Sequence, residues 1–203
     1  MPPQNSNPST VKAWDPLIRV FHWSLALCFL VTYVTEDDGM TLHIWAGYAA
    51  AILIGFRLLW GLIGTRNARF LSFVKSPQRV KQHLRDMLSL RPAHYLGHNP
   101  VAAVMVIALL VSIALAAFTG MMLIASDGQG PLAGTMFASF GGDAVKGIHE
   151  FFANFTLLLV LIHVGGVIVS SLLEGENLAK AMITGRKRAR EQWADVDPAR
   201  EAD

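Results

Sequence analysis

The stretch that decides the fold runs from Gly147 to Leu173 and reads GIHEFFANFTLLLVLIHVGGVIVSSLL. Its apolar run is long enough for a helix that crosses the hydrocarbon core of a membrane, which takes about 20 residues. His149 and His163 lie within this stretch, 14 residues apart. That spacing is close to four helical turns, so both imidazoles leave nearly one helix face, about 21 Å apart along the axis. An ionisable residue inside a membrane span is a candidate functional residue.

The rest of the chain has the composition of a membrane protein. Hydrophobic residues make up 53% of the 203 residues, charged residues make up 16%, and the mean hydropathy is +0.41. Three further apolar stretches approach the length of a span: about Leu17 to Thr35, Thr41 to Gly64 and Pro100 to Ala125. With the stretch from Gly147 to Leu173 as the fourth, the sequence predicts an all-α integral membrane protein, a bundle of four transmembrane helices.

The distribution of Lys and Arg predicts the orientation of these spans. The basic residues collect in the loop 65–99 and in the tail 176–203, and the positive-inside rule places both segments in the cytoplasm. Glu36, Asp37 and Asp38 form an acidic hairpin on the opposite side. Both termini are therefore expected in the cytoplasm, and the N-terminal segment 1–16 lacks the pattern of a cleaved signal peptide.

Two kinds of site are disfavoured by composition. The net charge is only +2, and the basic residues cluster in two stretches instead of spreading over one face. No nucleic-acid partner is therefore expected. Cys28 is the single cysteine, which excludes an intrachain disulfide and a site made of several cysteines.

Topology predicts how the intramembrane histidines pair by depth. His22 lies near the cytoplasmic start of the first span, whereas His43 lies at the outer start of the second, because consecutive spans run in opposite directions. His149 is near the outer entrance of the fourth span and His163 is deeper. We therefore expect His43 to face His149 at the outer level and His22 to face His163 at the inner level.

Two imidazoles that face each other inside a helical bundle are typical axial ligands of a b-type haem iron. The sequence has no CxxCH motif for covalent haem attachment. The alternative is that each histidine is a buried hydrogen-bonding residue. Zinc or di-iron sites fit less well, because the span interiors offer almost no carboxylates or thiolates. A proton or metal-ion transporter is the alternative of a different class, and it would lack haem absorption.

Other residues fit the same geometry. Arg57 follows His43 by 14 residues, so it is expected on the same face at the inner level, either pairing with a haem propionate or reaching for the interface. Arg19, one turn before His22, has the same two interpretations. Gly47, one turn after His43, removes side-chain bulk where a porphyrin would lie, and tight helix packing explains this glycine equally well. His83, His94 and His98 lie in or beside the basic loop and are expected to face water.

Several segments together resemble the bacterial cytochrome b561 superfamily. They are WDPLIRVFHW around His22, TLHIWAGY around His43, FRLLWGLIG around Arg57, GHNP before the third span, IHEFFANFTLLLVLIH around His149 and His163, and ENLAKAMITGRKR in the tail. The closest branch contains the b-type cytochrome subunits of nickel-iron hydrogenases and related di-haem electron-transfer cytochromes. The resemblance covers about Trp14 to Arg188, nearly the whole chain.

The resemblance implies two b haems, held at the positions of His22, His43, His149 and His163 in a protein of the bacterial inner membrane. Family members pass electrons in respiratory chains between exchangeable quinone and a partner on the periplasmic face, here a c-type cytochrome or a hydrogenase-like subunit. An electron-transfer subunit is expected more than a stand-alone oxidoreductase. The enzymatic alternative within the same fold is quinone reduction by superoxide or another external donor. The first outer hairpin is shorter than in typical hydrogenase subunits.

Overall fold

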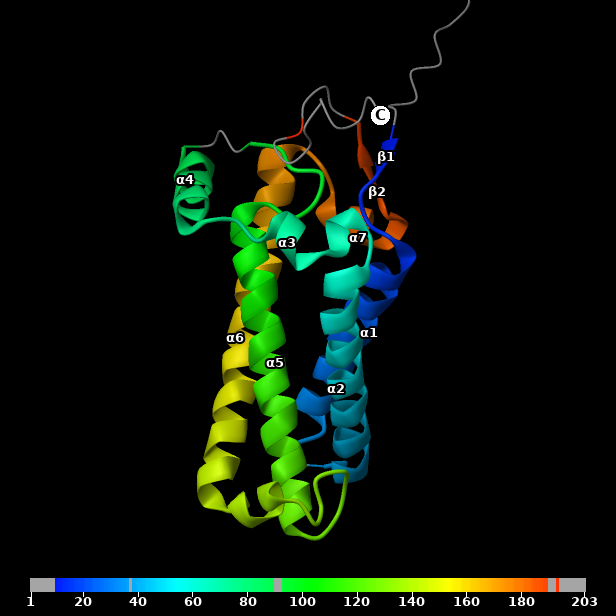
Figure 1. Cartoon of the computed structure of the whole chain (residues 1–203). Coiled ribbons are helices and arrows are strands. Elements are labelled where there is room, and N and C mark those ends of the chain that lie inside the picture. Colours follow the sequence, from blue (N-terminus) through cyan, green and yellow to red (C-terminus); the bar gives the residue numbers. More distant parts are fainter. Residues whose placement is uncertain (1–9, 37, 90–92, 190–192, 194–203) are drawn as a thin grey trace, which may run out of the picture.

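In the computed structural model, four long helices run side by side along most of the length of the molecule (Figure 1). They are α1 (Pro16–Val34), α2 (Met40–Ile63), α5 (Pro100–Ser126) and α6 (Asp143–Glu174). The structure describes residues 10–36, 38–89, 93–189 and 193. Part of the predicted N-terminal segment (1–9), Asp37 of the acidic hairpin, residues 90–92 of the basic loop and most of the tail (190–192 and 194–203) lie outside the described residues.

Local sequence determines where these helices begin and end. Asp15 and Asn99 cap α1 and α5, and each accepts a backbone N–H of the first turn, directly before a proline at the first helical position. The sequence placed the start of the fourth span at Gly147, but α6 begins earlier, at Asp143. The span was predicted from its apolar residues, whereas the helix continues into the charged segment before them, which includes Asp143 in the first turn. Gly175 ends α6 with φ +62°.

The four helices pack as two pairs that meet in the middle of the bundle. α1 lies along α2 and α5 lies along α6, while α2 also contacts α5. The core where they meet comprises Phe21, Leu25, Ala50, Ile54, Leu110 and Ile113. Between α5 and α6, the hydroxyls of Ser112 and Thr156 share a hydrogen bond of 2.7 Å, and these side chains are 1% and 0% exposed. This bond fixes α6 against α5 halfway between His149 and His163.

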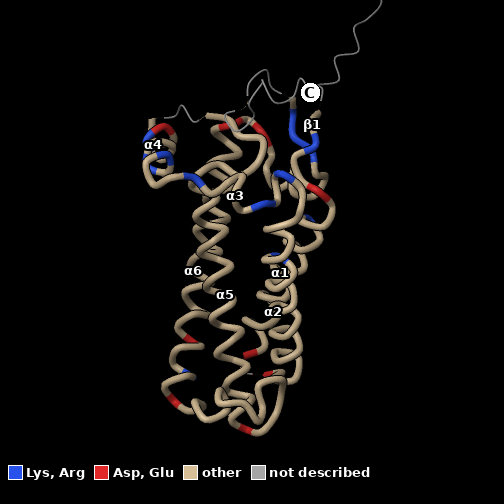
Figure 2. The backbone as a smooth tube through the Cα atoms, in the orientation of Figure 1, with Lys and Arg blue, Asp and Glu red and all other residues tan. Residues whose placement is uncertain are grey.

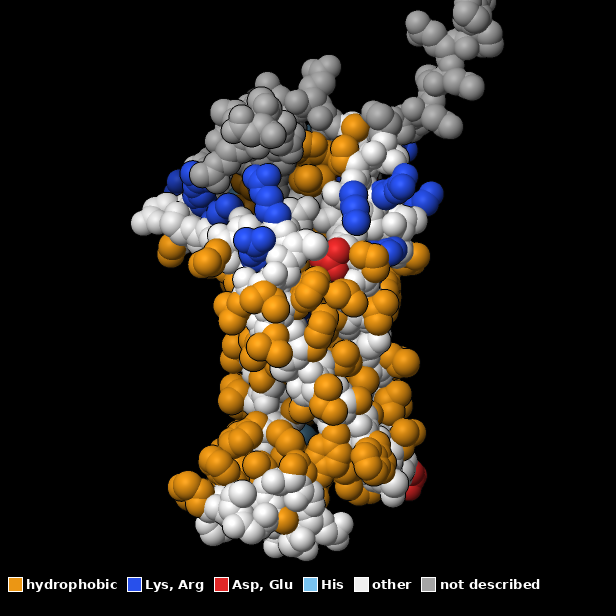
Figure 3. Space-filling view, turned by 45° about the vertical axis from the view of Figure 1, so that its right-hand side comes forward, with side chains coloured by type: hydrophobic (Ala, Val, Ile, Leu, Met, Phe, Trp, Pro, Cys, Tyr) orange, Lys and Arg blue, Asp and Glu red, His pale blue; other side chains and the backbone are white. Residues whose placement is uncertain are grey.

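The outer surface of the bundle is apolar. Hydrophobic side chains cover much of the face of the long helices seen in Figure 3, and Leu30, Ile52 and Leu161 are each more than half exposed. Within the described part of the chain, four helices are long and apolar enough to cross a membrane. An apolar surface of this extent needs lipid around it, which agrees with the prediction of four membrane spans.

Shorter elements cover one end of the bundle. They are η1 (Arg66–Ala68), α3 (Phe70–Phe73), α4 (Pro77–Leu88) and α7 (Leu178–Thr184), together with the antiparallel strands β1 (Thr10–Lys12) and β2 (Arg186–Arg188), in which Val11 faces Lys187. Lys and Arg collect at this end, which we call the basic end (Figure 2). The β pair departs from the all-α prediction, because two polar segments distant in sequence meet there. At the opposite end, η2 (Met136–Phe140) lies in the connection between α5 and α6.

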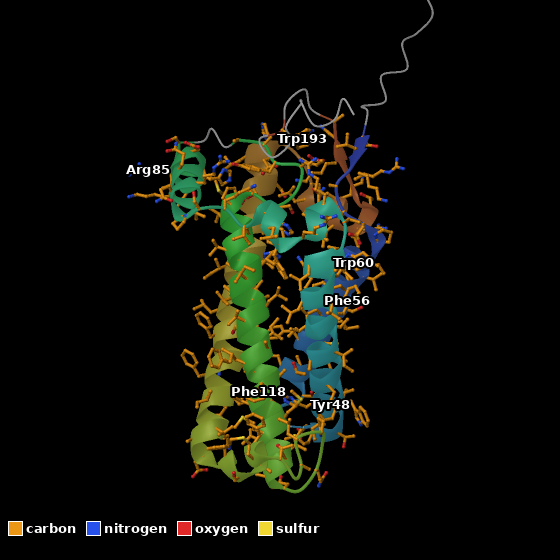
Figure 4. The ribbon with its side chains drawn as sticks, in the orientation of Figure 1. Tyr48, Phe56, Trp60, Arg85, Phe118 and Trp193 are labelled. Carbon is orange, nitrogen blue, oxygen red and sulfur yellow. The ribbon has the colours of Figure 1, made fainter. Side chains whose placement is uncertain are left out.

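Asp15 joins three segments at the basic end. Its carboxylate accepts the Ile18 N–H at 2.9 Å, the Thr65 hydroxyl at 2.6 Å and the Trp60 indole N–H at 3.4 Å. Trp60 in turn stacks on Phe56, one turn earlier on α2 (Figure 4), with ring centroids 6.0 Å apart. Burial alone would raise the pKa of Asp15, but the hydrogen bonds from Thr65, Ile18 and Trp60 outweigh it and lower the pKa.

Replacing Asp15 therefore tests how firmly the basic end is held. Asp15→Ala is expected to cost about 2 kcal/mol, because it removes a helix cap and leaves two side-chain donors without an acceptor. Asp15→Asn keeps an acceptor and should cost less, while Asp38→Ala, at an exposed carboxylate, should have little effect. Thermal unfolding in detergent measures these differences.

The pH dependence of this stabilisation has a definite sign. Because the folded state lowers the pKa, the contribution of Asp15 is complete above the usual aspartate pKa of about 3.9 and is lost as the pH falls below it. An Asp15→Ala variant as stable as the parent protein at pH 7 would contradict this role.

Candidate cofactor-binding site

The structure brings together one histidine from α2 and one from α6 at the end of the bundle opposite the basic end. The ring centroids of His43 and His149 are 6.1 Å apart, and the ring planes are inclined by 67°. The sequence analysis predicted this pair from the matching depths of the two histidines. We call it the outer pair.

A second pair lies nearer the basic end. The ring centroids of His22 on α1 and His163 on α6 are 6.3 Å apart, with the ring planes inclined by 54°. We call this the inner pair. Since α6 is continuous from Asp143 to Glu174, its rise of 1.5 Å per residue puts the two pairs about 21 Å apart along the helix.

Both separations suit a single metal ion between two imidazoles. A metal to imidazole nitrogen bond of about 2.0 Å on each side, plus the distance from each nitrogen to its ring centre, gives centroids about 6.2 Å apart. The described residues contain no group of three or more His, Cys, Asp or Glu side chains that could hold a metal ion. Two protein ligands per site suit an iron whose other ligands come from a porphyrin.

The outer pair is oriented by backbone carbonyls. His43 donates its Nδ1–H to the carbonyl of Thr32 at 2.8 Å, and His149 donates its Nδ1–H to the carbonyl of Ala116 at 2.8 Å. A carbonyl accepts and cannot donate, so each bond fixes the tautomer and leaves Nε2 without a proton. Metal-binding histidines are typically held in this way, because the second hydrogen bond orients the ring and raises the basicity of the ligating nitrogen.

Gly120 is a residue that the sequence analysis missed. A Cβ at this position on α5 would lie 3.1 Å from Cε1 and 3.4 Å from Nδ1 of His149. The absence of a side chain therefore lets the imidazole pack against the α5 backbone. The sequence could have indicated this contact, because residue 120 lies near the outer end of the third span and therefore at the same depth as His149.

Glycines elsewhere near the histidines leave open space. A Cβ at Gly47, Gly165 or Gly166 would meet nothing within 4 Å. Tight helix packing, which is the other explanation for glycines in a membrane bundle, would bring neighbouring atoms closer than that. The space at these positions is compatible with a bulky planar group beside the histidine pairs.

Arg57 is buried at the basic end of α2 and is only 3% exposed. Its guanidinium carbon lies 4.5 Å from the Phe70 ring centroid and 5.9 Å from that of Phe73. The buried Nη1 has no hydrogen-bond partner among the described residues. A side chain that reached for the aqueous interface would be exposed, so the interpretation that Arg57 reaches for the interface is wrong.

Arg19 has different surroundings. It donates from Nη1 to the carbonyl of Ile183 and thereby ties α1 to α7. Together with Pro16, Val20, Trp23, Ser24 and Ile183, it lines an open groove of about 550 Å³ on the side of the bundle. Trp23 connects this groove to the inner pair, since its ring centroid is 5.0 Å from that of His22.

The expectation that the three histidines of the basic loop face water is wrong for His83, and it holds only in part for His94 and His98, which are half-buried. His83 is 2% exposed and packs edge-on against Tyr95, and burial lowers its pKa. His98 has a buried Nδ1 and packs between Trp14 and Phe73. Burial, followed by the nearby cations Arg57 and Lys187, lowers the pKa of His98 to about 3. The error arose because the loop folds into α3 and α4 over the bundle end instead of extending into solvent.

Comparison with known proteins places this geometry in a family. A probable Ni/Fe-hydrogenase B-type cytochrome subunit of Bradyrhizobium diazoefficiens is 23% identical over 219 residues, covering 90% of this chain and 87% of the relative. A protein of Rhodobacter capsulatus with the same description is 21% identical over 216 residues, covering 88% and 82%. The family model described as prokaryotic cytochrome b561 matches residues 13–185. Because this match spans most of the sequence and all four long helices, the chain belongs to the prokaryotic cytochrome b561 family.

Proposed function

We propose that this protein is a di-haem b-type cytochrome that relays electrons across a bacterial inner membrane between quinone and a periplasmic redox partner. The observation that carries the proposal is the pairing of four histidines. Two pairs, at 6.1 Å and 6.3 Å between ring centroids, share the continuous helix α6. In this proposal His43 and His149 hold the outer haem, and His22 and His163 hold the inner haem.

Two b haems bound at these pairs would supply one-electron redox chemistry at two depths of the membrane. The residues of the chain set the conditions for that chemistry. The carbonyls of Thr32 and Ala116 orient the outer imidazoles, and the apolar core of α1, α2 and α5 excludes water between the two levels. Arg57 offers a buried positive charge toward the inner level, where it would bind a haem propionate.

The charge distribution supports the orientation in this proposal. Lys and Arg gather at the basic end, where β1 and β2 pair (Figure 2). By the positive-inside rule, we propose that this end faces the cytoplasm. The inner pair then lies toward the cytoplasm and the outer pair toward the periplasm. The names of the two relatives favour a hydrogenase-like subunit as the partner at the periplasmic face, and a c-type cytochrome is the alternative.

A reduced-minus-oxidised optical spectrum, combined with a pyridine haemochromogen assay on detergent-purified protein, tests the proposal. We expect two b haems per chain. Protein that folds and is supplied with haem but purifies without haem absorption would contradict the proposal and favour a proton or metal-ion pathway through the same histidines.

Variants of the histidines separate the two levels. Ligand loss should act on one haem only, because the pairs share no residue. His43→Ala or His149→Ala should therefore reduce the haem content from two to one per chain by removing the outer haem, and His22→Ala or His163→Ala should remove the inner one. Redox titration identifies which haem remains. A folded single variant that lost both haems would rule out independent pairs.

Gly120→Ala is expected to weaken the outer haem selectively. The added methyl group lies 3.1 Å from the His149 ring, so the ring must move away from the Ala116 carbonyl that orients it. Loss of such an orienting contact typically weakens metal binding roughly 10-fold or more. Haem retention during dilution measures the effect. Gly55→Ala is the matched control, since a Cβ there meets nothing within 4 Å. Equal haem retention in the two variants would show that Gly120 has no special role.

We further propose that quinone exchanges at the groove between α1 and α7. The groove is open, its volume of about 550 Å³ is in the range of small-molecule sites, and its Trp23 wall contacts the inner histidine. Arg19 and Ser24 supply hydrogen-bond donors for a quinone carbonyl, and Val20 offers an apolar wall. Arg19 then acts at the quinone instead of at a haem propionate.

Filling the groove tests this placement. Val20→Trp should slow reduction of the inner haem by a short-chain quinol about tenfold, because the indole occupies the space that the ring of the quinol requires. The optical spectrum should stay unchanged. Leu30→Trp places the same side chain on the exposed surface of α1 away from the groove and serves as the control. Stopped-flow reduction of both variants gives the comparison, and equal rates would exclude the groove.

A further inference from the structure

Three buried polar atoms around the inner level have no hydrogen-bond partner within the described part of the chain. They are Nδ1 of His22, Nη1 of Arg57 and Nδ1 of His98. A buried donor without an acceptor costs about 1–3 kcal/mol. Three such atoms around one region indicate a missing group that accepts hydrogen bonds.

His98 and Arg57 approach this region from different elements. The His98 ring, in the segment before α5, lies 4.6 Å from the Trp14 ring and 4.8 Å from the Phe73 ring by centroid distance. Arg57, on α2, lies over the ring of the same Phe73. His98 also interacts electrostatically with both histidines of the inner pair. Phe73 therefore holds two donors next to the inner pair.

Within the described residues, the carboxylate that acts electrostatically on Arg57 is already occupied. Asp15 influences Arg57 electrostatically, but its two oxygens already accept hydrogen bonds from Ile18, Thr65 and Trp60. Lys187, the other cation that acts on His98, donates to the carbonyl of Tyr95. The excess of positive charge and of unused donors matches an anionic ligand with carboxylate oxygens.

We propose that His98 is a further cofactor-binding residue, which donates its Nδ1–H to a propionate of the inner haem at the edge where Arg57 pairs with the same anionic group. This inference rests on the proposed di-haem function. The low pKa of His98 means that its ring is neutral at ordinary pH. A neutral imidazole carries one N–H, which is what a hydrogen bond to a carboxylate requires.

The hydrogen bond has a predictable effect on the inner haem. A propionate charge near the iron stabilises the ferric form, and a donor that binds the propionate weakens this stabilisation. Removing the donor should therefore lower the reduction potential of the inner haem. The outer haem, about 21 Å away along α6, should keep its potential.

The decisive variant is His98→Phe, which keeps a ring between Trp14 and Phe73 and removes both nitrogens. In redox titration of the purified holoprotein, the inner haem should shift toward its oxidised form by about tenfold in equilibrium constant, or about 59 mV for one electron. His98→Gln restores a donor and should recover most of the shift. An unchanged inner potential in His98→Phe would overturn the inference.

Two further variants exclude indirect effects. His83→Phe changes a different histidine of the basic end, which is buried, and should leave both potentials unchanged. An inner shift as large as that of His98→Phe would show that general loosening of this end is the cause. If His98→Phe fails to fold, His98→Leu removes the donor with a smaller side chain. An unchanged inner potential in that variant would equally overturn the inference.

The result also separates this inference from the proposed function. Parent protein without haem would remove the basis of both. Parent protein with two haems, together with a His98→Phe variant of parental potential, would refute only the role of His98. A structural role alone would lower the thermal stability of the variant without moving the inner potential.

Discussion

The periodicity of α6 is the constraint on which the site depends. His149 and His163 leave one face of a single helix because 14 residues nearly complete four turns. The hydrogen bond between Ser112 and Thr156 keeps that face at a fixed rotation relative to α5. A rotation of α6 by a quarter turn would remove both histidines from their partners on α1 and α2. The positions of the two pairs are therefore coupled through one rigid element.

The two histidine pairs differ in their surroundings. At the outer level, main-chain carbonyls of α1 and α5 hold His43 and His149, and Gly120 lets the backbone approach the ring. At the inner level, Nδ1 of His22 is buried without such a partner in the described residues. The inner level is instead surrounded by groups suited to an anion. In the proposed di-haem function, oriented ligands at the outer pair and a charged setting at the inner pair would be two means of tuning the haem potentials.

The basic end combines two roles that depend on the same contacts. Asp15 caps α1, ties it to Trp60 and Thr65, and is thereby occupied as an acceptor. Arg57 consequently stays buried over Phe70 and Phe73, and no carboxylate of the described residues binds its Nη1. The β1–β2 pair and α7 close this end from the other side, and Arg19 links α7 to α1. The folding of the polar segments thus determines which charges remain available to a cofactor.

The sequence by itself determined the four apolar helices, their order and the depth of each histidine, because these follow from span length, alternating direction and helical rise. It also singled out Arg57 by its spacing from His43. Only the tertiary structure decided that Nδ1 of His98 is buried, that Gly120 packs against His149, and that Arg19 points to α7. These contacts join residues far apart in the chain, and a periodic pattern within one helix carries no information about how neighbouring elements close over it.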